Sequence, residues 1–342
     1  MKKAKRLFAI VLVLGMVAAG IAGCGGGEAV ELNLAHFWPG NHPIETELVQ
    51  PWIAAVEEAT GGRVKITSYP GNTLCESAEV YEGVKNGVAD IGLSCFAYTR
   101  GQFPVLEVFE LPGVVYNDSA AASKIAWEGI KELNPKEIQD TTLMMVITTG
   151  PGHLFTKNPV NNIGDLKGLE IRATGLSAAT LQALGATPVA MSQAEAWDAL
   201  DKGIVKGNLG PMEILKGWNQ AEVTSYITLT PFLYNTLFFF TMNTDKWNKI
   251  SKHDQEEIRK INDRFFDEVA CGLWDRQNEA AYAYAVNEKG MKVIELSAAE
   301  KETWINLIKP VQDDFIKKMD NQGLNGREIL DKVLALADKY NK

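Results

Sequence analysis

The segment from Asp165 to Trp218 constrains the fold most, because short apolar runs alternate there with helical patterns. Strand-like runs at 169–172, 186–190 and 204–209 are separated by helix-like segments at 175–184 and 193–201. In a parallel sheet built this way, ligands bind at the carboxyl ends of the strands, beside helix N-termini. Arg172 falls at such an end, so the sequence predicts an α/β fold with a ligand site there.

The front of the chain repeats this alternation. Strand patterns at 31–36, 64–69 and 89–94 flank helical patterns at 44–60 and 76–86, which predicts a βαβαβ unit. The strand ends are aromatic or polar, and we expect their side chains to reach the same cleft: His36, Phe37, Trp38 and Tyr98. For His36, a structural role that holds the following loop is the alternative.

After residue 243 only helical patterns follow. The run 254–287 has no proline and repeats apolar residues at three and four residue steps, so an unbroken helix of about 50 Å is expected to cross two domains. We assign 31–152 plus about 243–285 to domain I, and 153–242 plus about 286–342, with the C-terminal helices, to domain II.

The N-terminus has the pattern of an export signal. A basic start precedes an apolar run that is too short to span a membrane comfortably, and Ile21-Ala22-Gly23-Cys24 resembles a bacterial lipobox. This predicts a lipoprotein signal peptide at 1–23, a lipid on Cys24 and a flexible glycine-rich tether at 24–30. An ordinary signal peptide, cleaved near the same small residues, is the alternative.

Charge and cysteine content argue against a nucleic-acid-binding protein and against a zinc site. Losing 1–23 removes four cations and no acid, so the formal charge goes from −9 to −13, which argues against nucleic acid as a partner. Cys75, Cys95 and Cys271 lack zinc-site spacing. They allow either one disulfide, such as Cys75 with Cys95, or three unpaired thiols.

Three motifs in the second half of the chain are informative together: DLKG with Ile171 and Arg172, LGATPVAM at 184–191, and Glu195, Ala199, Leu200, Gly203, Val205, Gly207 and Pro211. In these motifs the chain resembles the DctP-type solute-binding subunits of tripartite ATP-independent periplasmic (TRAP) transporters. Trp197 and Lys206 depart from the family pattern. The resemblance implies a two-domain periplasmic-binding-protein-like clamshell with a long domain-spanning helix, and an Arg172 that grips a ligand carboxylate through a bidentate contact. A local ion pair with Glu170 or Asp165 is the structural alternative for Arg172.

Further cleft residues are expected around Arg172: His153, Asn208, Glu213, Tyr234, Asn235 and Phe239. Many family members carry a second arginine near 152–159, where this chain offers only His153. They also often carry a polar residue where it has Gly210. With fewer polar contacts and several aromatic side chains, the site favours a monocarboxylate with a hydrophobic or aromatic body over succinate.

Catalysis is poorly supported by the sequence. His36 and His42 are spaced unlike a zinc pair, and no GxSxG sequence surrounds the Ser94-Cys95 pair. We therefore predict a binding protein without metal or cofactor, on the periplasmic or extracellular face of a membrane. It would deliver an organic acid to a small and a large TRAP membrane subunit. An ABC-type or sensory receptor, and less so an exported enzyme, are the alternatives.

Overall fold

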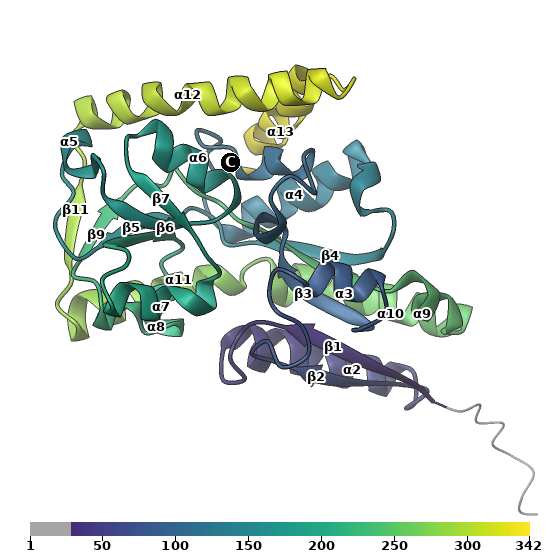
Figure 1. The fold of residues 1–342 in the computed structure, drawn as a ribbon. Helices are drawn as coiled ribbons and strands as arrows, with labels where there is room; N and C mark the ends of the chain where they lie inside the picture. The colour runs from purple at the N-terminus through teal and green to yellow at the C-terminus, as the bar shows by residue number, and fades with distance from the viewer. Residues whose placement is uncertain (1–28) are drawn as a thin grey trace, which may run out of the picture.

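The computed structural model describes residues 29–342. The predicted signal peptide, Cys24 and most of the tether therefore lie outside the described residues. Two α/β domains stand side by side, each built on its own sheet, and helices run along both edges of the pair (Figure 1). None of the helices in the described part is long and apolar enough to cross a membrane.

The first domain holds a five-stranded sheet in the order β2-β1-β3-β10-β4. Strands β1, β2 and β3 are parallel, whereas β10 pairs antiparallel with both β3 and β4. The strands are β1 (Val30–His36), β2 (Val64–Tyr69), β3 (Ile91–Cys95), β4 (Thr142–Thr148) and β10 (Leu237–Met242). The helices around this sheet include α2 (Gln50–Ala59), α3 (Val80–Lys85), α4 (Ser119–Leu133), α9 (Thr244–Lys249) and α10 (Lys252–Phe265).

The second domain holds a six-stranded sheet in the order β11-β9-β5-β8-β6-β7. Strand β6 is parallel to β7 and β8, while β5 is antiparallel to β8 and β9. Its strands are β5 (His153–Thr156), β6 (Glu170–Ala173), β7 (Thr187–Ala190), β8 (Gly207–Gly210), β9 (Tyr226–Leu229) and β11 (Lys292–Glu295). Its helices are α5 (Ile163–Leu166), α6 (Gly175–Ala183), α7 (Gln193–Asp201) and α8 (Ile214–Gly217).

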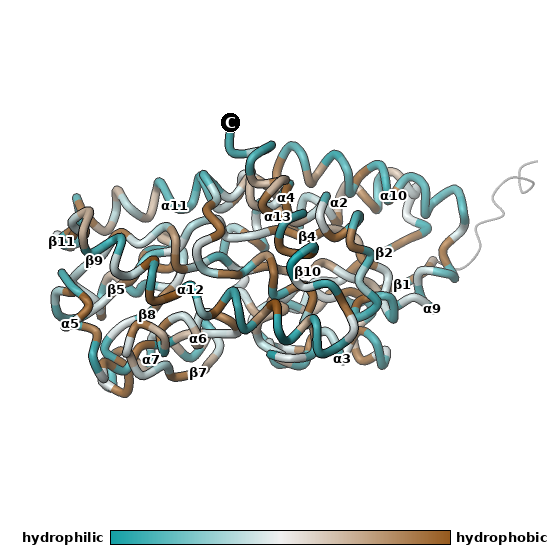
Figure 2. The backbone as a smooth tube through the Cα atoms, turned by 90° about the horizontal axis from the view of Figure 1, so that it is seen from above, coloured by the Kyte–Doolittle hydropathy of each residue, from teal (hydrophilic) through white to brown (hydrophobic). Residues whose placement is uncertain are grey.

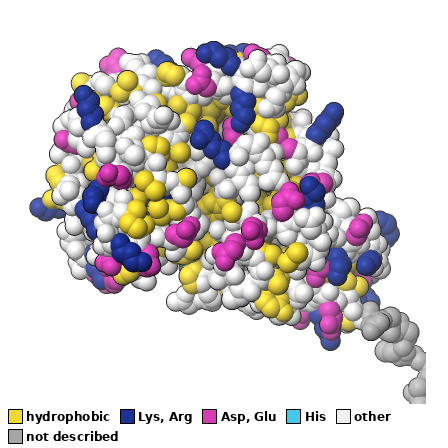
Figure 3. Space-filling model, in the orientation of Figure 1, with side chains coloured by type: hydrophobic (Ala, Val, Ile, Leu, Met, Phe, Trp, Pro, Cys, Tyr) yellow, Lys and Arg dark blue, Asp and Glu magenta, His cyan; other side chains and the backbone are white. Residues whose placement is uncertain are grey.

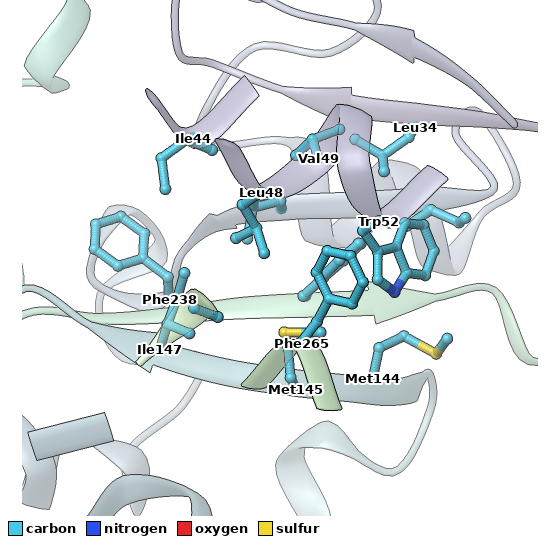
Figure 4. Close-up of a cluster of buried hydrophobic side chains, with 14 of the residues drawn as sticks. Leu34, Ile44, Leu48, Val49, Trp52, Met144, Met145, Ile147, Phe238 and Phe265 are labelled. Atoms are coloured by element: carbon cyan, nitrogen blue, oxygen red, sulfur yellow. The ribbon is translucent and has the colours of Figure 1, made fainter. Parts of the chain in front are cut away.

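Aromatic side chains form much of the core between the first sheet and helices α2 and α10. Trp52 of α2 packs edge-on against Phe240 of β10, with 4.7 Å between the ring centroids, and its indole N–H donates to Asn262 of α10. Figure 4 shows Trp52 beside Phe265 and above Met145. Because these side chains come from four elements, their burial fixes how helix and sheet fit together.

Two short segments connect the sheets directly, and the strand that follows each of them pairs antiparallel with its neighbours. The chain leaves the first sheet through 149–152 to enter β5, and it returns through 230–236 to form β10. Assigning 237–242 to domain II was therefore wrong, because β10 lies between β3 and β4 of the first sheet. The second sheet begins at β5.

The predicted spanning helix exists but is interrupted. A short π-helix (Phe266–Ala270) and a turn at Cys271 and Gly272 separate α10 from α11 (Leu273–Ala283). Helix α10 packs on α2, whereas α11 packs on both α4 and α8, so the pair reaches both domains. Figure 2 shows the two helices in succession along one side of the molecule.

The C-terminal helices also connect the domains. Helix α12 (Ala298–Asn321) buries Trp304 in the second domain and Phe315 in the core of the first. Helix α13 (Gly326–Tyr340) packs on α4. Assigning both helices to domain II was wrong, because an amphipathic pattern shows that a face is buried but does not show against which domain.

Candidate ligand-binding site

A narrow cavity separates the two domains at the carboxyl ends of their parallel strands. It is small, with a cavity volume of about 20 Å³. The lining is Phe37, Trp38, Cys95, Tyr98, Thr149, Arg172, Thr174, Gln193, Pro211, Glu213, Ile214, Trp218, Tyr234, Thr236, Phe238 and Trp274. Both sheets, the returning crossing segment and α11 all contribute to it, which is the arrangement expected of a cleft between hinged domains.

Arg172 is the cation of this cavity. It lies on β6, only 2% exposed. Its Nε donates to the Met191 carbonyl at 3.1 Å, and its Nη1 lies 3.4 Å from Asn208 Oδ1. Within residues 29–342 it makes no salt bridge, so the predicted alternative pairing with Glu170 or Asp165 is wrong. A buried guanidinium without a carboxylate partner is costly and is best balanced by an anionic ligand.

Two capping boxes place polar groups beside Arg172. Thr174 caps α6 and exchanges hydrogen bonds with Ser177, and Ser192 caps α7 with Glu195. The second box fixes Gln193 at the first position of α7. There its backbone N–H donates to the Tyr98 hydroxyl of the first domain at 3.1 Å. This hydrogen bond connects the domains on one side of the cavity.

A second interdomain hydrogen bond lies on the other side. His42 Nε2 is 3.3 Å from Glu213 Oε2, and both side chains are buried. Since the Ile44 backbone N–H donates to His42 Nδ1, the remaining proton is on Nε2 and is donated to Glu213. Gly217 permits this approach, because a Cβ there would meet Glu213 Oε2 at 2.6 Å and His42 Nε2 at 3.0 Å.

The first domain supplies an aromatic wall. Phe37 stacks on Trp38 at 3.8 Å between ring centroids and meets Tyr98 edge-on at 5.4 Å. On the far side of Trp38, Phe238 stacks on Trp274 at 5.0 Å. Burial raises the pKa of the Tyr98 and Tyr234 hydroxyls, so both remain neutral hydrogen-bonding groups. The wall offers flat apolar faces opposite one cation.

Six of the predicted residues line this cavity: Phe37, Trp38, Tyr98, Arg172, Glu213 and Tyr234. Asn208 lies behind Arg172 and holds it, while its own amide donates to Gln193 and Gln220. We therefore interpret Asn208 as a positioning residue rather than part of the cavity surface.

Besides Asn208, four predicted residues lie outside the lining. His36 bonds to Glu45 at 2.8 Å and thereby ties β1 to the following helical segment, so the structural interpretation holds for it. His153 accepts the Thr230 backbone N–H, and burial lowers its pKa to about 4. The Asn235 amide donates to a backbone carbonyl, and Phe239 packs into the core of the first domain. His153 therefore does not replace the second arginine that many family members carry near 152–159.

Several lining residues were not predicted, chiefly Gln193, Trp218, Phe238 and Trp274. Trp218 follows α8, and Trp274 lies on α11, far in sequence from either set of strand ends. A helix N-cap pattern before Gln193 was the one local signal available. Within residues 29–342 the cysteines Cys75, Cys95 and Cys271 are free and buried, so the structure has no Cys75–Cys95 disulfide.

The comparisons with known proteins decide the family. Residues 34–318 match the family described as bacterial extracellular solute-binding protein, family 7, also called DctP. The chain belongs to this family. The resemblance to TRAP transporter solute-binding subunits is thereby confirmed, as is the two-domain clamshell fold.

Three solved solute-binding proteins show the similarity in detail. A marine metagenome TRAP protein specific for aromatic acid ligands, bound to metahydroxyphenylacetate, is 29% identical with a TM-score of 0.86, covering 92% of this chain and 100% of that one. A Rhodoferax ferrireducens protein with copurified benzoate is 27% identical, with a TM-score of 0.83 and coverage of 91% and 98%. A Bordetella bronchiseptica protein with bound mandelate is 26% identical, with a TM-score of 0.84 and coverage of 91% and 99%.

Proposed function

We propose that this solute-binding protein captures a monocarboxylate with an aromatic body between its two domains and delivers it to the TRAP membrane subunits. The observation that carries the proposal is Arg172, a buried cation without an anionic partner among the described residues, opposite an aromatic wall. Glu213 lines the same cavity, and its negative charge would repel a second carboxylate. This favours a monocarboxylate over a dicarboxylate.

The similar solved structures support this ligand class. Those quoted above hold metahydroxyphenylacetate, benzoate or mandelate, each an aromatic acid. Phe37 and Trp38 give this chain flat apolar surface for such a ring. We infer that the protein binds its ligand without transforming it.

Export and anchoring complete the proposal. The family is extracellular, and we infer from the lipobox that Cys24 carries a lipid, which would hold the protein near its membrane partners. The face in Figure 3 intersperses basic and acidic side chains. A Cys24→Ala protein should move from the membrane fraction to the soluble fraction. Wild type that is already soluble and starts at another residue would contradict the lipid assignment.

Arg172 provides the test of the ligand class. Truncating one partner of a desolvated charge pair costs about 2–5 kcal/mol, so Arg172→Ala should weaken benzoate binding by roughly thirty-fold to several thousand-fold. Arg172→Lys keeps the charge without the planar fork and should fall between alanine and wild type. Arg327→Ala, an exposed arginine on α13, is the matched control.

The measurement is isothermal titration with benzoate and succinate, supported by melting curves. Ligand at a hundred times its dissociation constant stabilises wild type by about 2.7 kcal/mol. A folded Arg172→Ala protein that binds benzoate as wild type does would remove the carboxylate assignment. Tighter binding of succinate than of every aromatic acid tested would refute the aromatic class.

A further inference from the structure

Unpartnered N–H donors gather at the ligand cavity. Among the buried side-chain atoms of residues 29–342 that have no hydrogen-bond partner are Gln193 Nε2, Trp218 Nε1 and Trp274 Nε1, and all three residues line the cavity with Arg172. A buried donor left unpaired costs about 1–3 kcal/mol. Their concentration in one place indicates that a ligand supplies the acceptors.

The Gln193 amide lies on the Arg172 side of the cavity. Its Oε1 accepts from Asn208 Nδ2 at 3.2 Å, and Asn208 Oδ1 in turn faces Arg172. This hydrogen bond fixes the orientation of the amide and leaves Nε2 as a donor. Since a carboxylate accepts about four hydrogen bonds, one gripped by Arg172 can also satisfy Gln193.

The two indoles lie against the aromatic wall instead. The Trp274 ring stacks on Phe238, and the Trp218 ring faces Phe37 at 6.1 Å between centroids with an angle of 21° between the planes. In the described part of the chain, no hydrogen bond joins either indole to Arg172 or Asn208. An indole N–H can only donate, so each indole requires an oxygen acceptor beside the ring-binding surface.

Glu213 adds an acceptor near the same indoles. It lies at the N-cap of α8 and Trp218 at the C-cap, and both line the cavity. Of the two carboxylate oxygens of Glu213, only Oε2 is hydrogen-bonded within residues 29–342, to His42. A hydroxyl group can accept from an indole and donate to a carboxylate at once, whereas a keto oxygen or a second carboxylate cannot do both. The chemistry of this end of the cavity therefore matches a hydroxyl.

We propose that Trp218 and Trp274, with Glu213, form a second polar position that selects aromatic monocarboxylates carrying a hydroxyl group away from the carboxylate. The proposal rests on the proposed function and narrows its ligand class. In this arrangement Arg172 binds the carboxylate, and the indole N–H groups donate to the hydroxyl oxygen.

The test compares matched ligands by isothermal titration: benzoate, the three hydroxybenzoate isomers and the three methylbenzoates. Wild type should bind the best hydroxybenzoate about tenfold or more tightly than its methyl counterpart, as expected for pairing otherwise unsatisfied donors. Trp218→Phe or Trp274→Phe removes one N–H and keeps an aromatic ring. At least one of these variants should lose about tenfold for the hydroxylated ligand and less than twofold for benzoate.

Two controls keep the result interpretable. Trp127→Phe changes an indole that packs on Phe266, outside the cavity, and should leave all ligands unaffected. Glu213→Gln should weaken the hydroxybenzoate more than benzoate. Benzoate is the internal reference, because a general loss of packing lowers the affinity of both ligands equally.

Each outcome discriminates between the two proposals. Equal losses for hydroxylated and unsubstituted acids, or a wild type that prefers the methyl analogue, would overturn the hydroxyl position while leaving Arg172-dependent benzoate binding intact. If no aromatic acid binds, or if binding is independent of Arg172, the proposed function fails and the hydroxyl position fails with it.

Discussion

Breaking the His42–Glu213 hydrogen bond should favour the open form of the cleft. The bond joins the two domains at 3.3 Å with both side chains buried. When the domains separate, water can hydrate both groups, so truncating one of them penalises only the closed form. Removing one partner of a buried hydrogen bond costs about 1–3 kcal/mol, which shifts the closed-to-open equilibrium roughly 5-fold to 150-fold.

Ligand affinity and compactness should both report this shift. If only the closed form holds the ligand tightly, the dissociation constant of His42→Ala for benzoate rises by up to the same factor. At a benzoate concentration that half-saturates wild type, small-angle scattering should show a larger radius of gyration for His42→Ala than for wild type. Benzoate is the appropriate probe because it carries no hydroxyl that could contact Glu213 directly.

A double-mutant cycle separates this bond from other effects of the substitutions. His42→Ala also removes the acceptor of the Ile44 backbone N–H, so the coupling with Glu213→Gln is the informative quantity. His253→Ala, an exposed histidine on α10, is the control. Purely additive effects of His42→Ala and Glu213→Gln on affinity, or unchanged scattering, would refute the reasoning.

Two buried titratable groups predict opposite pH dependences of stability. Burial raises the pKa of Glu110, which accepts the Leu237 backbone N–H, from 4.5 to about 8. The folded protein therefore loses stability as the pH rises between these two values. Glu110→Gln should remove a loss on the order of 4 kcal/mol, measured by comparing melting curves at pH 5 and pH 9. Burial lowers the pKa of His153 to about 4 from 6.5, so its stability contribution is present above pH 6.5 and is lost as the pH falls. Since His153 is partly exposed, His153→Gln should remove an acid loss of no more than about 2 kcal/mol. Unchanged pH profiles of either variant would contradict the assignment.

Local patterns predicted most strands and helices, because glycine, proline and apolar periodicity mark where they begin and end. Helix α7 and strand β2 have the predicted limits. The position of β10 was not predictable in this way, since its place between β3 and β4 depends on pairing with strands far away in the sequence. Antiparallel insertion after a domain crossing leaves no local mark in a buried apolar strand.

Within the site, some predictions failed by one residue, because side chains alternate in direction along a strand. Phe239 was chosen from the right strand, yet its neighbour Phe238 lines the cavity, because successive strand residues point to opposite faces. At the end of β1 the same effect turns His36 toward Glu45 while Phe37 lines the cavity. For Arg172, the strand pattern indicated a position at the carboxyl end of a strand, and the family motif indicated a role in binding a carboxylate.

We infer that closure of the cleft is coupled to ligand charge through Arg172. Leaving this guanidinium buried without an anion costs several kcal/mol, whereas the His42–Glu213 bond stabilises the closed form by only about 1–3 kcal/mol. The interdomain hydrogen bonds alone therefore do not offset the burial of the cation. A bound carboxylate removes the larger penalty, so closure follows capture of an anion, and the smaller bond then determines how long the closed form persists.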